Sequence, residues 1–316
     1  MSLAPPGRKA AAMESGTSGT VLTKDLVAAD GQLVASRGEV VDLALLKDVA
    51  ARAPRGVRER PLFETTHAEA VLQAFESPAL QHLAGNEAAR ALAADALAEV
   101  RFPQAVWDEL ESLQTQDAPR YQHAIFSGVT AARLFRAALG SGPGVPRMVG
   151  GALVHDIGML HVALRLRFKR DHLTRAEALA LEDHPLLGAL LLASMLGDAP
   201  AVHFALLHHT RAGFGYPRIE GTPPLRGLDL IAVASAFAAL VCPRSFRVTP
   251  FNPRGAVDQL LEDAEAGHFD PRAVRLLIHC LRGGRGPLQD LQLPRKPTGF
   301  RPKVNHHGLA PEARAA

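Results

Sequence analysis

The sequence predicts a mainly α-helical protein, in which an all-helical domain follows a small α/β module at the N-terminal end. Across residues 118–285 apolar side chains recur at the spacing of a helix face, and glycine and proline mark the breaks between segments. Residues 20–60 differ, because short β-prone runs flank Asp30 and Gly31, a dipeptide typical of a hairpin turn. We therefore expect helices to build most of the protein and strands to be confined to the first module.

The segments outside the helical domain are distinguished by composition. Residues 1–19 are rich in Ala, Gly, Ser and Pro and predict a disordered tail. A helix at residues 42–51 is expected to close the module of residues 20–60. Residues 61–117 are alanine-rich with helical periodicity, which predicts a helical connector packed beside the main domain. Residues 286–316 follow a glycine-rich stretch and predict a flexible, solvated tail.

Within the main domain, the apolar stripes and their breaks predict a series of helices. These lie at residues 118–139, 147–160, 199–209 and 227–241. Thr174 and Glu177 have the spacing of a capping box, which predicts the start of a further helix that ends near His184, before Pro185.

Polar side chains at predicted core positions indicate a metal site. Burying the adjacent His155 and Asp156 among apolar residues costs roughly 2–7 kcal/mol for each unpaired group, and a metal ion is the simplest compensation. Imidazole nitrogen and carboxylate oxygen together suit ions such as Fe, Mn, Zn, Co or Ni. Taken singly, each histidine also fits an ordinary hydrogen-bonded residue, Asp156 a local cap, and His184 a charge at a helix end. The ordered set favours metal, and the candidate ligands are His123, His155, Asp156, His184, His208 and His209.

The ordered series of motifs resembles the HD-GYP family of bacterial signalling phosphodiesterases from His123 to Pro271. The matching motifs are residues 155–158, His184-Pro185 with Gly188, His208-His209, Gly215-Tyr216-Pro217 and residues 269–271. The resemblance implies an all-helical HD-type domain over residues 118–285, which binds one or two divalent ions such as Fe or Mn, with Asp156 as the catalytic bridge between metals. It also implies hydrolysis of cyclic di-GMP to pGpG or GMP in the cytoplasm.

The loop after the double histidine supplies the candidate substrate contacts, which are Arg211, Gly215, Tyr216 and Pro217. An arginine is a good phosphate ligand, because its guanidinium donates paired hydrogen bonds. Tyr216 suits either stacking on a base or packing inside the protein.

The sequence departs from the family pattern at several positions. Met159 stands where the family has a lysine, Thr210 where it has a glutamate, and Pro119 where three-metal members have a glutamate. Ser235 replaces the late aspartate ligand, and a neutral hydroxyl is a poor substitute for a carboxylate on a divalent ion. These departures leave an alternative open, a catalytically degenerate receptor or scaffold in bacterial signalling. Its expected partners are cyclic di-GMP or a related nucleotide, with a diguanylate cyclase, a response regulator or a second copy of the chain.

Composition excludes several other classes. The net charge of +3 on 316 residues is mildly basic and does not indicate nucleic-acid binding. Cys242 and Cys280 fit a reducing cytoplasm without a disulfide framework. No run of about 18 apolar residues occurs, so no membrane span is expected, and residues 185–196 predict a buried helix instead.

Overall fold

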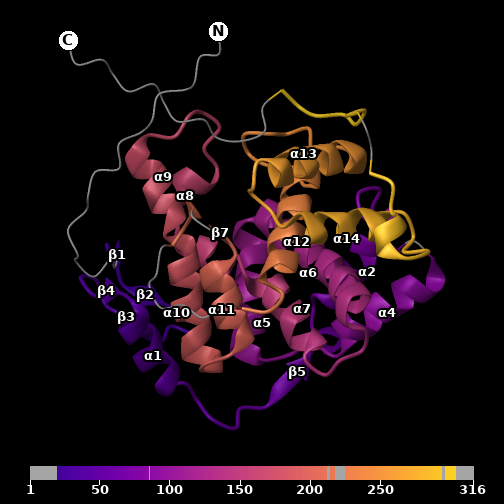
Figure 1. The fold of residues 1–316 in the computed structure, drawn as a ribbon. Coiled ribbons are helices and arrows are strands. Elements are labelled where there is room, and N and C mark those ends of the chain that lie inside the picture. The colour runs from indigo at the N-terminus through magenta and orange to yellow at the C-terminus, as the bar shows by residue number, and fades with distance from the viewer. Residues whose placement is uncertain (1–19, 85, 212–213, 218–224, 294–295, 304–316) are drawn as a thin grey trace, which may run out of the picture.

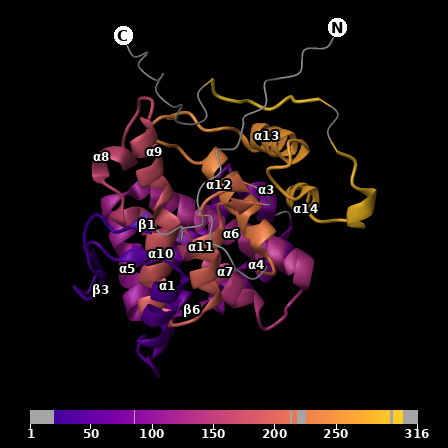
Figure 2. The same cartoon turned by 60° about the vertical axis from the view of Figure 1, so that its left-hand side comes forward.

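The computed structural model describes residues 20–84, 86–211, 214–217, 225–293 and 296–303, so the predicted tail at residues 1–19 lies outside the described residues. Helices dominate these residues and the strands form short pairs, which confirms the predicted mainly α fold. Figure 1 and Figure 2 show the N-terminal module on one side of the molecule, against α10, and the C-terminal helices α13 and α14 close to α12.

The N-terminal module consists of two antiparallel strand pairs and one helix. Its elements are β1 (Thr20–Val21) paired with β4 (Val40–Val41), β2 (Leu26–Val27) paired with β3 (Leu33–Ala35), and α1 (Leu43–Ala51). The β2–β3 pair confirms the hairpin predicted around Asp30 and Gly31. Asp42 begins α1 as its N-cap, because its side chain accepts the Leu45 N–H at 2.8 Å.

The connector is helical as predicted, with one strand pair that the sequence did not predict. Its elements are β5 (Glu59–Pro61), η1 (Leu62–Glu64), α2 (Ala68–Glu76), α3 (Gln81–Ala84), α4 (Glu87–Ala98), β6 (Arg101–Pro103) and α5 (Gln104–Gln116). β5 and β6 pair antiparallel across the intervening helices. Each strand has three residues, which is too short for a readable alternation of polar and apolar side chains.

The long helix α6 (Ala118–Leu139) is the centre of the main helical unit. It is buried over most of its length and packs against α4, α7 and α12. The elements that follow it are α7 (Val145–Val154), η2 (Ile157–His161), α8 (Leu164–Arg167), α9 (Arg175–Glu182), α10 (His184–Leu196), α11 (Pro200–Leu207), β7 (Thr210–Arg211), β8 (Phe214–Gly215) and α12 (Leu228–Val241).

Two predicted helix boundaries are wrong. The helix expected to continue to residue 160 ends at Val154, because Asp156 leaves the helical conformation and a 3-10 turn follows. His184 does not end the preceding helix but is the first residue of α10. Pro185 lies in the first turn of α10, where its missing N–H costs nothing, so here proline starts a helix instead of stopping one.

The C-terminal elements are α13 (Pro253–Glu265), α14 (Pro271–Leu281) and η3 (Leu288–Asp290). Part of the segment that was predicted as a flexible tail contacts α13. The Asp258 carboxylate accepts the N–H groups of Thr298 and Gly299 at 2.8 and 2.9 Å, and Arg301 pairs with Glu262 at 2.7 Å. Residues 296–303 are therefore bound to the helical unit.

One helical stretch among the described residues, Arg175–Leu196, is long and apolar enough to cross a membrane by length and composition alone. Two thirds of it is buried inside the fold. The predicted buried helix at residues 185–196 is confirmed, since it corresponds to α10, whose residues are mostly buried.

Candidate metal centre

Four segments bring the six predicted ligands together. His123 lies within α6, while the other candidates lie at helix ends: His155 and Asp156 directly after α7, His184 at the start of α10, and the double histidine directly after α11. Because these ends meet beside α6, ligands that are up to 86 residues apart in sequence share one buried site.

A close backbone contact fixes the distance between two of these segments. A Cβ on Gly158 would lie 2.0 Å from the His184 carbonyl oxygen and 2.4 Å from the Gly188 N atom. Such contacts are impossible, so glycine at position 158 is required for η2 to pack against α10. This contact gives a structural reason for the His-Asp-Ile-Gly motif, since it brings Asp156 and His184 side by side.

The candidate ligands form two groups, each with ligand atoms within 4.8 Å of one another. We call them the triple-histidine group (His184, His208 and His209) and the Asp156 group (His123, His155 and Asp156). The Asp156 carboxylate joins them. Its Oδ1 atom lies 3.1 Å from His184 Nε2, whereas its Oδ2 atom lies 3.7 Å from His123 Nε2. Each oxygen of the Asp156 carboxylate thus faces one of the two groups, and its role as a bridge between metals stays a prediction.

Three imidazole rings are held with Nε2 directed into the site. In each, Nδ1 lies within hydrogen-bond distance of the carbonyl oxygen three residues earlier and donates to it. The pairs are His155 with Ala152 at 2.8 Å, His184 with Leu181 at 2.6 Å and His208 with Ala205 at 2.8 Å. Because Nδ1 carries the proton, the neutral ring presents its Nε2 lone pair, which is the form that binds a metal.

Burial sets the charge state of the site. It lowers the pKa values of His123, His208 and His209 well below the usual histidine value, so these rings are neutral near pH 7. Burial alone would raise the pKa of Asp156, but the adjacent His184 ring and the positive charge of Arg120 hold it well below its usual value. Neutral imidazoles beside an ionised carboxylate are the donor set that divalent transition metals prefer.

Two contacts test whether the site suits a cation. His184 Nε2 and His208 Nε2 lie 3.1 Å apart, so two lone pairs face each other unless a positive charge bridges them. His123 Nδ1 is buried without a hydrogen-bond partner among the described residues. Leaving a buried nitrogen unpaired costs roughly 1–3 kcal/mol. The first contact fits a divalent metal ion better than it fits an ordinary polar core, whereas an ion held through His123 Nε2 would leave His123 Nδ1 unpaired.

Ser235, the position of the missing aspartate ligand, lies within this site. It lies on the buried face of α12, and its Oγ atom is 3.0 Å from His155 Nε2 and 3.4 Å from His123 Nε2. Since His155 Nδ1 already donates to Ala152, the Ser235 hydroxyl donates to His155 Nε2. The hydroxyl therefore occupies a lone pair that a metal ion would need.

Two arginines that the sequence pattern did not single out lie beside the centre. Arg120 Nη1 lies 3.1 Å from Asp156 Oδ2, and the Arg120 side chain is 21% exposed. Arg244 follows α12, and its Nη1 atom is buried without a hydrogen-bond partner among the described residues. Burial lowers the pKa of Arg244 to about 10, so the guanidinium stays charged at neutral pH. Arg120 precedes His123 by three residues, about one helical turn, and this spacing was the available signal.

The loop after the double histidine supports the centre through its backbone. Gly215 of β8, which pairs with Thr210, has φ +89°, and a Cβ there would lie 2.1 Å from the His209 carbonyl oxygen. Tyr216 stacks on the His209 ring at 4.7 Å with an angle of 27°. Tyr216 therefore packs against a candidate ligand, and stacking on a base stays a prediction. Pro217 follows through a cis peptide bond, and Thr210 donates its hydroxyl to the Pro217 carbonyl at 3.3 Å.

Arg211 donates to its own loop. Its guanidinium reaches the carbonyl oxygens of His208, Thr210 and His268 at 2.8, 2.9 and 3.0 Å, and it covers the Phe269 ring. A phosphate contact by Arg211 stays a prediction. Met159, at the family's lysine position, is buried in a small apolar cluster and offers no charge to the site.

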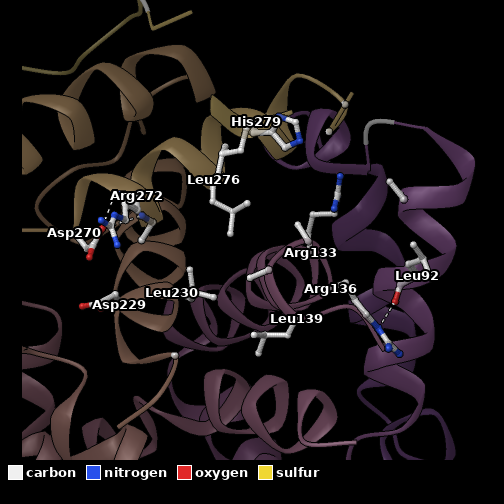
Figure 3. Close-up of a pocket in the computed structure, with 18 of the residues that line it drawn as sticks. Leu92, Arg133, Arg136, Leu139, Asp229, Leu230, Asp270, Arg272, Leu276 and His279 are labelled. Atoms are coloured by element: carbon white, nitrogen blue, oxygen red, sulfur yellow. Dashed lines mark hydrogen bonds between the residues drawn. The ribbon is translucent and has the colours of Figure 1, made fainter. Parts of the chain in front are cut away.

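A separate cavity of about 860 Å³ lies between α4, α6, α12 and α14. Figure 3 shows the residues that line it, among them Arg133 of α6 and Leu276 of α14. None of the six candidate ligands lines this cavity, so the metal centre is argued from its donor atoms and not from cavity size.

Comparisons with known proteins agree with the resemblance. No protein-family model matches the chain. The chain is 26% identical over 133 residues to the cyclic di-GMP phosphodiesterase PdeB of Borreliella burgdorferi. The matched region covers 41% of this chain and 34% of that protein. It is 31% identical over 137 residues to a cyclic di-GMP phosphodiesterase of Vibrio cholerae, and this match covers 40% of this chain and 27% of that protein.

A third relative acts on a different cyclic dinucleotide. The chain is 34% identical over 128 residues to the 3'3'-cGAMP-specific phosphodiesterase 1 of Vibrio cholerae, and this match covers 40% of this chain and 30% of that protein. The matches thus span about a third of the length of these relatives. The predicted resemblance to cyclic dinucleotide phosphodiesterases is confirmed at this level.

Proposed function

We propose that the chain is an HD-GYP-type, metal-dependent phosphodiesterase that hydrolyses cyclic di-GMP to pGpG or GMP. The observation that carries this proposal is the convergence of five imidazoles on the Asp156 carboxylate, with the Nε2 lone pairs of His184 and His208 fixed toward the same site. The similarity to cyclic di-GMP phosphodiesterases supports the substrate class.

The residues of the chain have separate roles in this proposal. The triple-histidine group and Asp156 Oδ1 would hold a divalent ion such as Fe or Mn. A bound ion of this kind would supply Lewis acidity and lower the pKa of a coordinated water to about 7. Arg244, with a buried and unpartnered Nη1, is suited to bind a phosphate oxygen of the substrate. Arg211 and residues 215–217 would position the nucleotide and the His209 ring.

The test is hydrolysis by the metal-loaded protein. Purified chain reconstituted with Mn²⁺ is incubated with cyclic di-GMP, and pGpG and GMP are separated by chromatography. We expect product with the wild type and a loss of at least about 100-fold in Asp156→Asn, which keeps the shape and removes the charge. Asp229→Asn is the matched control, because Asp229 is exposed and lines the separate cavity. Hydrolysis that persists unchanged in Asp156→Asn would reject the site.

A second function is favoured by Ser235 and Met159. The Ser235 hydroxyl binds a histidine nitrogen, and Met159 is buried among apolar side chains, so one ligand and one phosphate cation of the family pattern are replaced. We propose as the alternative a receptor or scaffold that binds cyclic di-GMP without cleaving it. Calorimetric binding of cyclic di-GMP with no product after long incubation would favour this alternative.

The cellular setting is proposed on the same grounds. For either function we propose a cytoplasmic location. The proposed signalling partners are a diguanylate cyclase or a response regulator, and a homodimer is a further proposal. Using 3'3'-cGAMP as a second substrate in the hydrolysis assay tests the choice of nucleotide, because one relative is named for that substrate.

A further inference from the structure

We propose that the Arg120 guanidinium takes the place of a second metal ion beside Asp156, so that the centre binds a single divalent ion. That ion belongs to the triple-histidine group. The inference rests on the proposed function, because it concerns the same centre, and it adds a role for Arg120.

The first argument is the position of the Arg120 charge. Arg120 Nη1 lies 3.1 Å from Asp156 Oδ2, and His123 Nε2 lies 3.7 Å from the same oxygen. Any cation bound by the Asp156 group would therefore share its one carboxylate oxygen with a guanidinium. This guanidinium already occupies one side of that oxygen, so a metal ion there would have to displace it or share the oxygen with it.

The second argument is the balance of charge in the Asp156 group. Its histidines meet the neutral Ser235 hydroxyl, so Asp156 is the one carboxylate among these contacts. The positive charge of Arg244 also reaches both His123 and His155. A divalent ion bound there would be repelled by the positive charges of Arg120 and Arg244 and attracted by a single carboxylate oxygen, Asp156 Oδ2. This balance of charge opposes binding.

A second carboxylate, Asp117, lies near Arg120, but its direct ion pair is with another arginine. Asp117 lies close to Arg120 in sequence, but its Oδ2 atom pairs with Arg167 Nη1 at 3.4 Å. Its Oδ1 atom accepts the Arg120 backbone N–H at 3.2 Å as the N-cap of α6. The charges of Asp117 and Arg120 do act on each other, but the direct ion pair of the Arg120 guanidinium is with Asp156.

The third argument is that the triple-histidine group meets no such competition. Asp156 Oδ1, which faces this group, is 3.1 Å from His184 Nε2 and 3.9 Å from His208 Nε2. Arg211 is the closest arginine in sequence, but its guanidinium donates to backbone carbonyls. Three imidazole nitrogens and one carboxylate oxygen supply the four ligands that suffice for a divalent ion.

The experiment counts ions directly. The full chain is stripped with a chelator, loaded with excess Mn²⁺ and desalted, and manganese per chain is measured by elemental analysis and by frozen-solution EPR. We expect about one ion per chain in the wild type, with the six-line signal of an isolated Mn²⁺. In Ser235→Asp the count should stay near one, since Arg120 still neutralises Asp156. In the double variant Arg120→Met/Ser235→Asp it should rise to about two, with an exchange-coupled spectrum.

Two control variants separate charge from disturbance of the helix. Arg120→Lys/Ser235→Asp keeps the positive charge and should bind about one ion. Arg136→Met/Ser235→Asp removes another buried arginine of α6, which lies about four turns away and pairs with Glu99, and it should also bind about one ion.

The outcomes distinguish this inference from the proposed function. Two ions in the wild type, or one ion in a folded Arg120→Met/Ser235→Asp variant, overturns the role of Arg120. If the double variant does not fold, the wild-type count alone decides. Two ions together with cyclic di-GMP hydrolysis would leave the proposed function standing without this inference, whereas no ion and no hydrolysis would reject both.

Discussion

Replacing Gly158 with alanine is expected to displace the candidate metal ligands, although none of these ligands is itself substituted. The added Cβ would lie 2.0 Å from the His184 carbonyl oxygen and 2.4 Å from Gly188 N. Both atoms belong to the backbone of α10, so no side-chain rotation relieves the clash. Since carbon atoms rarely approach closer than 3.0 Å, η2 and α10 must separate by at least about 1 Å. His184 and Asp156 then move apart.

The size of the effect follows from this displacement. A misplacement of about 1 Å in a catalytic group typically costs on the order of 100-fold in rate. Overpacking a rigid contact costs about 1–3 kcal/mol of stability. We therefore expect Gly158→Ala to lower Mn²⁺ affinity, to lower hydrolysis about 100-fold and to lower the free energy of unfolding by about 1–3 kcal/mol. The assays are metal titration, product formation and urea unfolding.

Gly142→Ala is the matched control for this variant. A Cβ at position 142 meets only the Leu139 carbonyl oxygen, at an ordinary 3.7 Å, so its metal affinity and activity should equal those of the wild type. A Gly158→Ala protein with wild-type metal affinity, activity and stability would refute the contact between η2 and α10 as the device that sets the ligand geometry.

Three further predictions concern other contacts. Glu109→Gln should stabilise the fold by about 1–3 kcal/mol more at pH 8 than at pH 4 in urea unfolding. Burial raises the pKa of Glu109 to about 7, so its contribution to stability is present below pH 4.5 and is lost as the pH rises through 7. The glutamine of the variant does not titrate and still accepts the Ala29 N–H. Equal effects of the substitution at both pH values would contradict this. Burial lowers the pKa of His161 to about 4, so the metal-free protein should lose stability as the pH falls from 6.5 toward 4, and His161→Leu should lose about 1–3 kcal/mol less over that range. An equally acid-sensitive variant would exclude His161 as the source. Tyr216→Ala should weaken Mn²⁺ binding roughly tenfold by releasing the His209 ring, while Tyr216→Phe should not, and equal affinities would show that the stacking is unimportant.

Sequence reasoning predicted what depends on local pattern. The ligands were identifiable because histidine and aspartate at core positions of a helical pattern are costly without a partner. Helix boundaries at His155 and His184 were missed, because they depend on the contact between Gly158 and α10, which joins distant segments.

Contacts across the fold were also beyond the sequence. The ion pair between Arg120 and Asp156 joins residues 36 positions apart, and no periodicity reports such a pair. The contacts of Arg211 were not predictable either: its guanidinium donates to three backbone carbonyls, and the phosphate contact that its place in the loop suggested stays a prediction. Arg120 and Arg211 thus have different partners because tertiary packing sets the direction of each side chain.

The most direct test of the metal centre is anomalous diffraction from crystals of the Mn²⁺-loaded protein, recorded on both sides of the manganese absorption edge. We predict one anomalous peak, within about 2.5 Å of ligand atoms of the triple-histidine group and of Asp156 Oδ1. A peak at a surface carboxylate cluster, or fully loaded crystals without a peak among these histidines, would contradict the account.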